Sequence, residues 1–209
     1  MRIAVINETS AADRNADIMA ALENSAGHEI INIGMKKNFD TPELTYIHTG
    51  FLSALLLHLG IVDFVVGGCG TGQGYLNSVL QYPGVTCGLV ASPLDAWLFT
   101  QINGGNCISL RLNQGYGWAS NENLKFIFER IFSVERGCGY PPHRQESQQE
   151  SLRMMNQVSE ATHKSFVDIV LSLPKFVIQP AINYPGVLDL LDLKHMSNGS
   201  LASTLNRLT

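Results

Sequence analysis

The stretch that decides the fold is Asp63-Phe64-Val65-Val66-Gly67-Gly68-Cys69-Gly70-Thr71-Gly72-Gln73-Gly74. Its first residues form an apolar run typical of a buried strand, and five glycines in the last eight positions surround one thiol and one hydroxyl. Glycines let backbone N–H groups approach a ligand closely and form an anion-binding concavity. Because the thiolate is the reactive form of cysteine, a thiol among such donors is a candidate reactive group. We therefore expect a buried strand that leads into a functional loop around Cys69.

Two common phosphate-binding loops do not fit this stretch. No Lys-Ser or Lys-Thr pair follows the glycines, as a P-loop requires. Neither Gly68-x-Gly70 nor Gly70-x-Gly72 has a glycine three residues after its second glycine, as the dinucleotide-binding fingerprint requires. Nucleotide binding by a general Rossmann-type protein is therefore the weaker interpretation.

The composition excludes several classes of protein. With 209 residues, 45% apolar and 15% charged, the chain is long enough to bury a sizeable core. A formal net charge of −4 without a run of Lys or Arg argues against nucleic-acid binding, which needs a clustered basic surface. The sequence opens directly with a strand pattern and has no run of about 18 apolar residues, so we expect no leader, no membrane segment and a cytoplasmic location.

The cysteines do not predict a metal site. Cys69, Cys87, Cys107 and Cys138 form no Cys-x-x-Cys pair, so zinc binding and dithiol chemistry are not expected. In a reducing compartment all four thiols should be free. Apart from Cys69, we interpret each as a small buried hydrophobic residue.

Up to Phe132, strand and helix patterns alternate. Strands are expected at 2–7, 29–33, 61–66, 85–91 and around Ile108, and helices at 13–27, from Thr41-Pro42 to Gly60, after the glycine loop, from the cap Ser92-Pro93-Leu94-Asp95, and at 119–132. Repeated strand–helix units predict the α/β class: a Rossmann-like three-layer αβα sandwich with a five-stranded parallel sheet. Since such sheets bind ligands beyond the carboxyl ends of their strands, residues 7–8, 69–74, 92 and 103–106 should converge there.

The composition and the predicted secondary structure change beyond Phe132. Residues 135–150 combine Arg, Pro and Gln and predict an extended connector. One helical pattern then runs from Ser151 to Leu171, and prolines interrupt the chain after it. Since residues 150–209 make a poor independent core, we predict an α/β domain over 1–149 and a helical C-terminal extension over 150–209, packed on that domain or on a partner subunit.

Residues 69–74 match the pattern Cys-Gly-Thr-Gly-x-Gly, and the chain from Met1 to Arg144 resembles the family of type B ribose-5-phosphate isomerases and galactose-6-phosphate isomerases that carries it. Gln101-Ile102-Asn103-Gly104-Gly105-Asn106 is similar to the family's Arg/Gln-His-Asn-x-x-Asn. The resemblance implies an aldose–ketose isomerase that needs no metal or organic cofactor. A cysteine base moves a proton between C1 and C2 while loop amides hold the enediolate oxygen, roles that would fall to Cys69 and to residues 70–74.

The chain also departs from this family. Glu8-Thr9 stands where the family has Asp-His, and Ile102 replaces the histidine credited with sugar ring opening. Leu80-Gln81 stands where an Asn-Lys pair is expected, and the tail Gly-Gly-Arg-His is matched only loosely by residues 136–144. These departures favour a short or open-chain sugar, or ring opening by another group.

The candidate site residues each have a structural alternative. The catalytic candidates are Cys69 and Thr71, and the substrate-binding candidates are Glu8, Gly70, Gly72, Gln73, Gly74, Asn103, Arg136, His143 and Arg144. Thr71 and Asn103 also suit ordinary turns, and Glu8 also suits a helix cap. The basic residues of 136–144 are solvated if taken singly, but together they suit a phosphate or carboxylate clamp.

Three function classes remain open from the sequence: an aldose–ketose isomerase, a non-catalytic sugar-phosphate binder, and the less favoured nucleotide binder. The resemblance implies a homodimer, or a tetramer built from it, with each site between two subunits. The partner would supply the basic residues of 136–144, and helices within 42–59 or 151–171 would make the contact.

Overall fold

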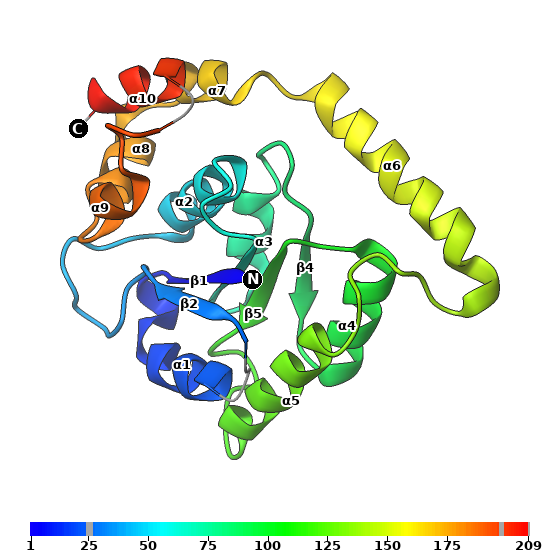
Figure 1. The fold of residues 1–209 in the computed structure, drawn as a ribbon. Coiled ribbons are helices and arrows are strands. Elements are labelled where there is room, and N and C mark those ends of the chain that lie inside the picture. The colour runs from blue at the N-terminus through cyan, green and yellow to red at the C-terminus, as the bar shows by residue number, and fades with distance from the viewer. Residues whose placement is uncertain (24–26, 197–198, 209) are drawn as a thin grey trace.

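The computed structural model describes residues 1–23, 27–196 and 199–208. In these residues a five-stranded parallel sheet, ordered β2-β1-β3-β5-β4, lies between layers of helices (Figure 1). The strands are β1 (Arg2–Asn7), β2 (Glu29–Asn32), β3 (Phe64–Cys69), β4 (Cys87–Val90) and β5 (Cys107–Arg111). The predicted three-layer α/β sandwich with a five-stranded parallel sheet is confirmed.

Helices cover both faces of the sheet (Figure 1). One face carries α2 (Tyr46–His58) and α3 (Gln73–Val79), and the other carries α1 (Asn15–Glu23), α4 (Pro93–Leu98) and α5 (Ser120–Phe132). Two short irregular turns complete this part of the chain: η1 (Thr9–Arg14) and η2 (Phe99–Asn103), a π-helical turn that continues α4. Each face has its own apolar cluster, because alternate residues of the strands point to opposite sides.

The central strand β3 runs three residues further than the sequence indicates. We expected it at 61–66, but Gly67, Gly68 and Cys69 also pair with β5. The Tyr75 ring occupies the space beside Gly67, where an added Cβ would lie 2.2 Å from the ring. Glycine is therefore required by packing at this position, and the functional loop begins only at Gly70.

Two helix starts differ from those expected. Asp13 does not cap α1; its Oδ1 accepts the backbone N–H of Asn38 at 2.9 Å and tethers the loop after β2. The expected end of that helix near Gly27 adjoins residues 24–26, which lie outside the described residues. The second start was placed at Thr41-Pro42, but α2 begins at Tyr46, because Thr45 and His48 form a capping box.

The C-terminal part contains five helices in the described residues: α6 (Gln145–Thr162), α7 (Phe166–Ser172), α8 (Lys175–Ile182), α9 (Val187–Leu191) and α10 (Gly199–Asn206). Two expectations are corrected here. The connector ends earlier than predicted, because a turn η3 (Pro142–Arg144) leads directly into α6. The single helix expected at 151–171 is broken at Ser165, whose Oγ accepts the Asp168 N–H at 3.2 Å and so caps α7.

Helices α7–α10 pack outside α2, whereas α6 stands apart from the sheet (Figure 1). Phe166 on α7 stacks on His58 at 4.3 Å between ring centroids and joins the apolar cluster of α2. In contrast, no residue of α6 is buried. The boundary at 149/150 stays a prediction. Among the described residues, no helix combines the length and apolarity needed to cross a bilayer.

Replacing Gly67 by alanine should destabilise the fold, because the new methyl group overlaps the Tyr75 ring. Overpacking of this kind costs about 1–3 kcal/mol of unfolding free energy. Urea unfolding followed by circular dichroism measures the loss. The control Gly117→Ala, with nothing within 4 Å of its new Cβ, should stay within about 0.5 kcal/mol of the parent. Equal unfolding midpoints for Gly67→Ala and the parent would contradict the packing argument.

Candidate active site

The site lies at the carboxyl edge of the sheet, where the connections of β1 and β3 diverge. From β1 the chain passes to β2 on one side, and from β3 it passes to β4 and β5 on the other. Open parallel sheets bind ligands at such a switch point. There β1 ends at Asn7, which Glu8 follows, and beside it β3 ends at Cys69, which Gly70 follows.

A serine links the ends of these two strands. The Ser10 hydroxyl donates a hydrogen bond to Glu8 Oε1 and accepts one from the Gly70 N–H at 2.9 Å. Glu8 is buried and is the N-cap residue of η1, but its side chain makes no cap hydrogen bond. Burial raises the pKa of the Glu8 carboxyl, although the Ser10 hydrogen bonds partly oppose this. The carboxyl is therefore held beside the glycine loop and is easier to protonate than an ordinary glutamate.

Cys69 closes β3 with a buried side chain, and its Sγ lies 4.0 Å from Thr71 Oγ1. Its carbonyl accepts the N–H groups of Gly72 and Leu112, each at 3.1 Å. Gly72 has a φ of 75°, a left-handed conformation that favours glycine, and Ser109 donates to its carbonyl at 2.6 Å. The loop is thus fixed by its own backbone before any substrate binds.

Not all loop amides are free to bind substrate. The Gly70 N–H is used by Ser10, the Gly72 N–H by Cys69, and the Gln73 N–H by Thr71 Oγ1 at 3.3 Å. Within the described residues, the amides of Thr71 and Gly74 donate no hydrogen bond. These two are the available donors for an oxygen held beside Cys69.

A cleft of about 480 Å³ opens next to Ser10. It is lined by Thr9, Ser10, Met35, Asn38, Phe39, Asp40, Glu43 and Asn113, a set without histidine, lysine or arginine. Asn113 donates through Nδ2 to the Ser10 carbonyl at 2.6 Å and through its N–H to the Gly70 carbonyl at 3.0 Å. The sequence analysis does not identify Ser10 or Asn113 as site residues. The available signal was their position in the chain: Ser10 lies two residues after Glu8, and Asn113 lies two residues after the end of β5.

The other predicted site residues lie elsewhere in the chain. Asn106 accepts the Thr86 N–H at 2.9 Å, a contact at the amino ends of β4 and β5. Residues 103–106 therefore sit at the opposite edge of the sheet from Cys69, and the expectation that they converge with it in one chain is wrong. The physical reason is that α4 and η2 run back across the sheet before β5 begins.

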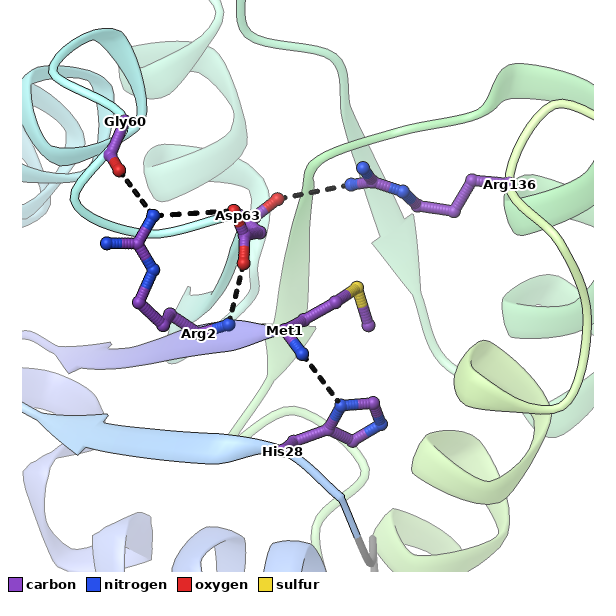
Figure 2. A network of polar contacts seen from close by, with 6 residues as sticks. All are labelled: Met1, Arg2, His28, Gly60, Asp63 and Arg136. Carbon is purple, nitrogen blue, oxygen red and sulfur yellow. Dashed lines mark hydrogen bonds and ion pairs between the residues drawn. The ribbon is translucent and has the colours of Figure 1, made fainter.

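Arg136 also lies at the amino edge, where its Nη1 donates to the Asp63 carbonyl at 3.1 Å (Figure 2). The segment after it packs on η2, since the Gly139 N–H donates to the Gln101 carbonyl at 2.9 Å. The η3 turn then presents two exposed basic side chains. We call this set the second cluster: Asn103, Arg136, His143 and Arg144.

Comparisons with known proteins agree with this fold. A family model described as Ribose/Galactose Isomerase matches residues 3–136. A ribose-5-phosphate isomerase from Vibrio parahaemolyticus is 38% identical with a TM-score of 0.94, covering 100% of this chain and 99% of its own. A 4-deoxy-L-threo-5-hexosulose-uronate ketol-isomerase, solved with a tartrate, is 34% identical with a TM-score of 0.94 and the same coverage.

More distant structures share only the fold. A ribose 5-phosphate isomerase from Thermotoga maritima is 19% identical with a TM-score of 0.61, and it covers 75% of this chain and 97% of its own. The comparison with curated protein sequences gives no match. The family match spans more than half of the chain, and the two similar structures span all of it. The chain therefore belongs to the ribose/galactose isomerase family and is a sugar isomerase of the aldose–ketose type.

Proposed function

We propose that the substrate is an open-chain sugar acid, of the 4-deoxy-5-hexosulose-uronate type on which one of the similar structures acts. The observation that carries this proposal is the loss of the histidine that the family resemblance credits with ring opening, since Ile102 stands in its place. Thr9 and Ile102 stand at the two positions where the family resemblance places histidines, and the lining of the cleft has no histidine.

The chemistry of such a uronate explains why no ring-opening group is needed. A sugar aldehyde at C1 closes a ring by reacting with a hydroxyl at C4 or C5. In a 4-deoxy-5-hexosulose uronate, C4 has no oxygen and C5 is a ketone, so neither hydroxyl is available. Ribose 5-phosphate keeps its C4 hydroxyl and forms a ring. A site that lacks the family's ring-opening histidine therefore suits the uronate better than the pentose phosphate.

In the proposed mechanism, the Cys69 thiolate removes the proton from C2 and returns it to C1. The hydroxyl proton passes from O2 to O1, so an aldehyde becomes a ketone without an external oxidant. The amides of Thr71 and Gly74 and the Thr71 hydroxyl hold the enediolate oxygen, since fixed donors stabilise charge that develops in the transition state. Glu8 binds a substrate hydroxyl from the other side of the loop.

A second copy of the chain completes the site in this proposal. Helix α6 has 18 residues, none of them buried, and it exposes Met154, Met155 and Val158. Since most helical stability in proteins comes from packing of an apolar face, such a helix needs a cover. We propose a homodimer that buries well over about 1,000 Å² and brings the second cluster of one subunit to the Cys69 edge of its partner.

The substrate assignment predicts a defined turnover pattern. The purified protein should isomerise 4-deoxy-L-threo-5-hexosulose uronate, and Cys69→Ala should lose about 100-fold to 10,000-fold in kcat, because the base is removed. Cys87→Ala, a thiol at the amino edge of the sheet, is the matched control and should keep its activity. Turnover of ribose 5-phosphate at about 10 per second, with none of the uronate, would refute the assignment. Binding without any turnover would favour a non-catalytic binder.

Glu8→Gln should raise stability at neutral pH while lowering activity. Because burial raises the pKa of Glu8, its contribution to stability is full below its ordinary value of 4.5 and is lost as the pH rises through the raised value. The neutral amide keeps the shape of the side chain without the cost of burying a charge. Thermal melts at pH 7.5 and pH 4 should show a gain for Glu8→Gln only at pH 7.5, with the exposed Glu129→Gln as control. A loss of stability at pH 7.5 would contradict the argument.

The composite site predicts complementation between inactive chains. Cys69→Ala and the double change Arg136→Ala/Arg144→Ala should each be inactive as homodimers. After joint refolding in equal amounts, half of the dimers are mixed and each has one intact site, so about a quarter of parental activity should return. Mixtures that stay inactive, or a fully active monomer in light scattering, would defeat the shared site.

A further inference from the structure

Arg111 ends β5 directly beside Cys69. The two residues are register partners in the β3–β5 ladder, so their side chains leave the sheet on the same face. The alternation along β5 agrees, because Cys107 contacts the Tyr75 hydroxyl at 3.4 Å and Ser109 bonds the Gly72 carbonyl, both on the α3 side. Arg111 is therefore the cationic side chain placed next to the thiol within one chain.

The aliphatic part of the Arg111 side chain packs against the glycine loop, while the residue as a whole is exposed to solvent. A Cβ built on Gly72 would lie 3.3 Å from Arg111 Cγ, so the stem lies against the glycine loop. Arg111 is the one exposed residue of an otherwise buried strand. Within the described residues its guanidinium has no ion pair and no hydrogen bond, whereas Arg2 and Arg153 pair with Asp63 and Glu150.

The charges around the loop are unevenly distributed. On the cleft side lie the carboxylates of Asp40 and Glu43, with Glu8 behind Ser10, and the lining has no cation. On the other side of Cys69 lies Arg111, the last residue of β5. An anionic substrate is therefore drawn with its negative group toward Arg111 and away from the cleft carboxylates.

The spacing also fits a six-carbon sugar acid. In a hexosulose uronate the carboxylate carbon is four bonds of about 1.5 Å from C2, an extended span of roughly 5 Å. Adjacent strands are about 4.8 Å apart, so a substrate of this length with C2 at Cys69 is long enough to reach across to β5. A guanidinium binds a carboxylate through two parallel hydrogen bonds.

We propose that Arg111 is a specificity-determining residue that binds the substrate carboxylate. The inference rests on the proposed function but uses none of the second cluster, because Arg111 and Cys69 share one edge of one chain. In this proposal the preference for a sugar acid comes from Arg111 at the end of β5 and not from residues of the partner subunit.

The test compares Arg111→Met, which keeps the stem but removes the charge, with Arg111→Lys and with the exposed control Arg130→Met. Calorimetric titration with tartrate, a dicarboxylate, measures anion binding without turnover. Arg111→Met should weaken tartrate binding and raise KM for the uronate by about 10-fold to 100-fold, the loss typical of a charged hydrogen-bonded pair. The value of kcat should change much less, and Arg111→Lys should fall between Met and the parent.

The outcomes separate this inference from the proposed function. No uronate turnover by the parent, with tartrate binding lost only in Arg111→Met, would sink the substrate assignment and support the anion site. Unchanged KM and tartrate affinity in a folded Arg111→Met protein would overturn the inference. So would a loss of tartrate binding confined to Arg136→Ala/Arg144→Ala, since the carboxylate would then belong to the partner's cluster. Circular dichroism of every variant checks folding.

Discussion

The close contact between the Tyr75 ring and Gly67 is the constraint on which the site depends. Only a residue without a side chain at 67 leaves room for the ring beside β3, where its hydroxyl reaches Ser53 at 2.7 Å and Cys107 at 3.4 Å. This contact fixes α3 against the sheet. Because α3 starts at Gln73, the short loop between it and Cys69 has no freedom to rearrange. The loop must turn sharply, and Gly72 takes the left-handed conformation that the turn requires.

The sequence predicted the architecture because each strand–helix unit carries its own signals. The apolar run before Gly67 and the cap at Ser92 are local features, and local features decide where elements form. The boundaries of β3 and α2 were less well predicted. At β3, glycines that suggest a loop are instead paired strand residues, and this pairing depends on the partner strands β1 and β5.

The sequence predicted only part of the candidate site, because some of its residues are brought together by contacts that are distant in the chain. Cys69 and the glycine loop carry their chemistry in one continuous stretch, so the pattern identifies them. Ser10 and Asn113 contribute through backbone geometry that spans 60 and 103 positions of the chain, and no local pattern reports it. The expected convergence of residues 103–106 with Cys69 was wrong for a different reason. Residues 103–106 follow a helix that returns to the amino edge, and a parallel sheet places such residues far from the carboxyl edge of the same chain.

The C-terminal helices bear on the site through α2. His48 accepts the Thr45 N–H on Nδ1 at 3.0 Å, so its Nε2 carries the proton and donates to the Phe176 carbonyl on α8 at 3.0 Å. One imidazole thus caps α2 and anchors the extension. The same end of α2 presents Tyr46, whose ring lies against Gly74. Helix α8 therefore supports the end of α2, against which Gly74 of the glycine loop packs. This connection gives the extension a part in shaping the site, and it accounts physically for a long C-terminal segment that packs on α2 rather than folding on its own.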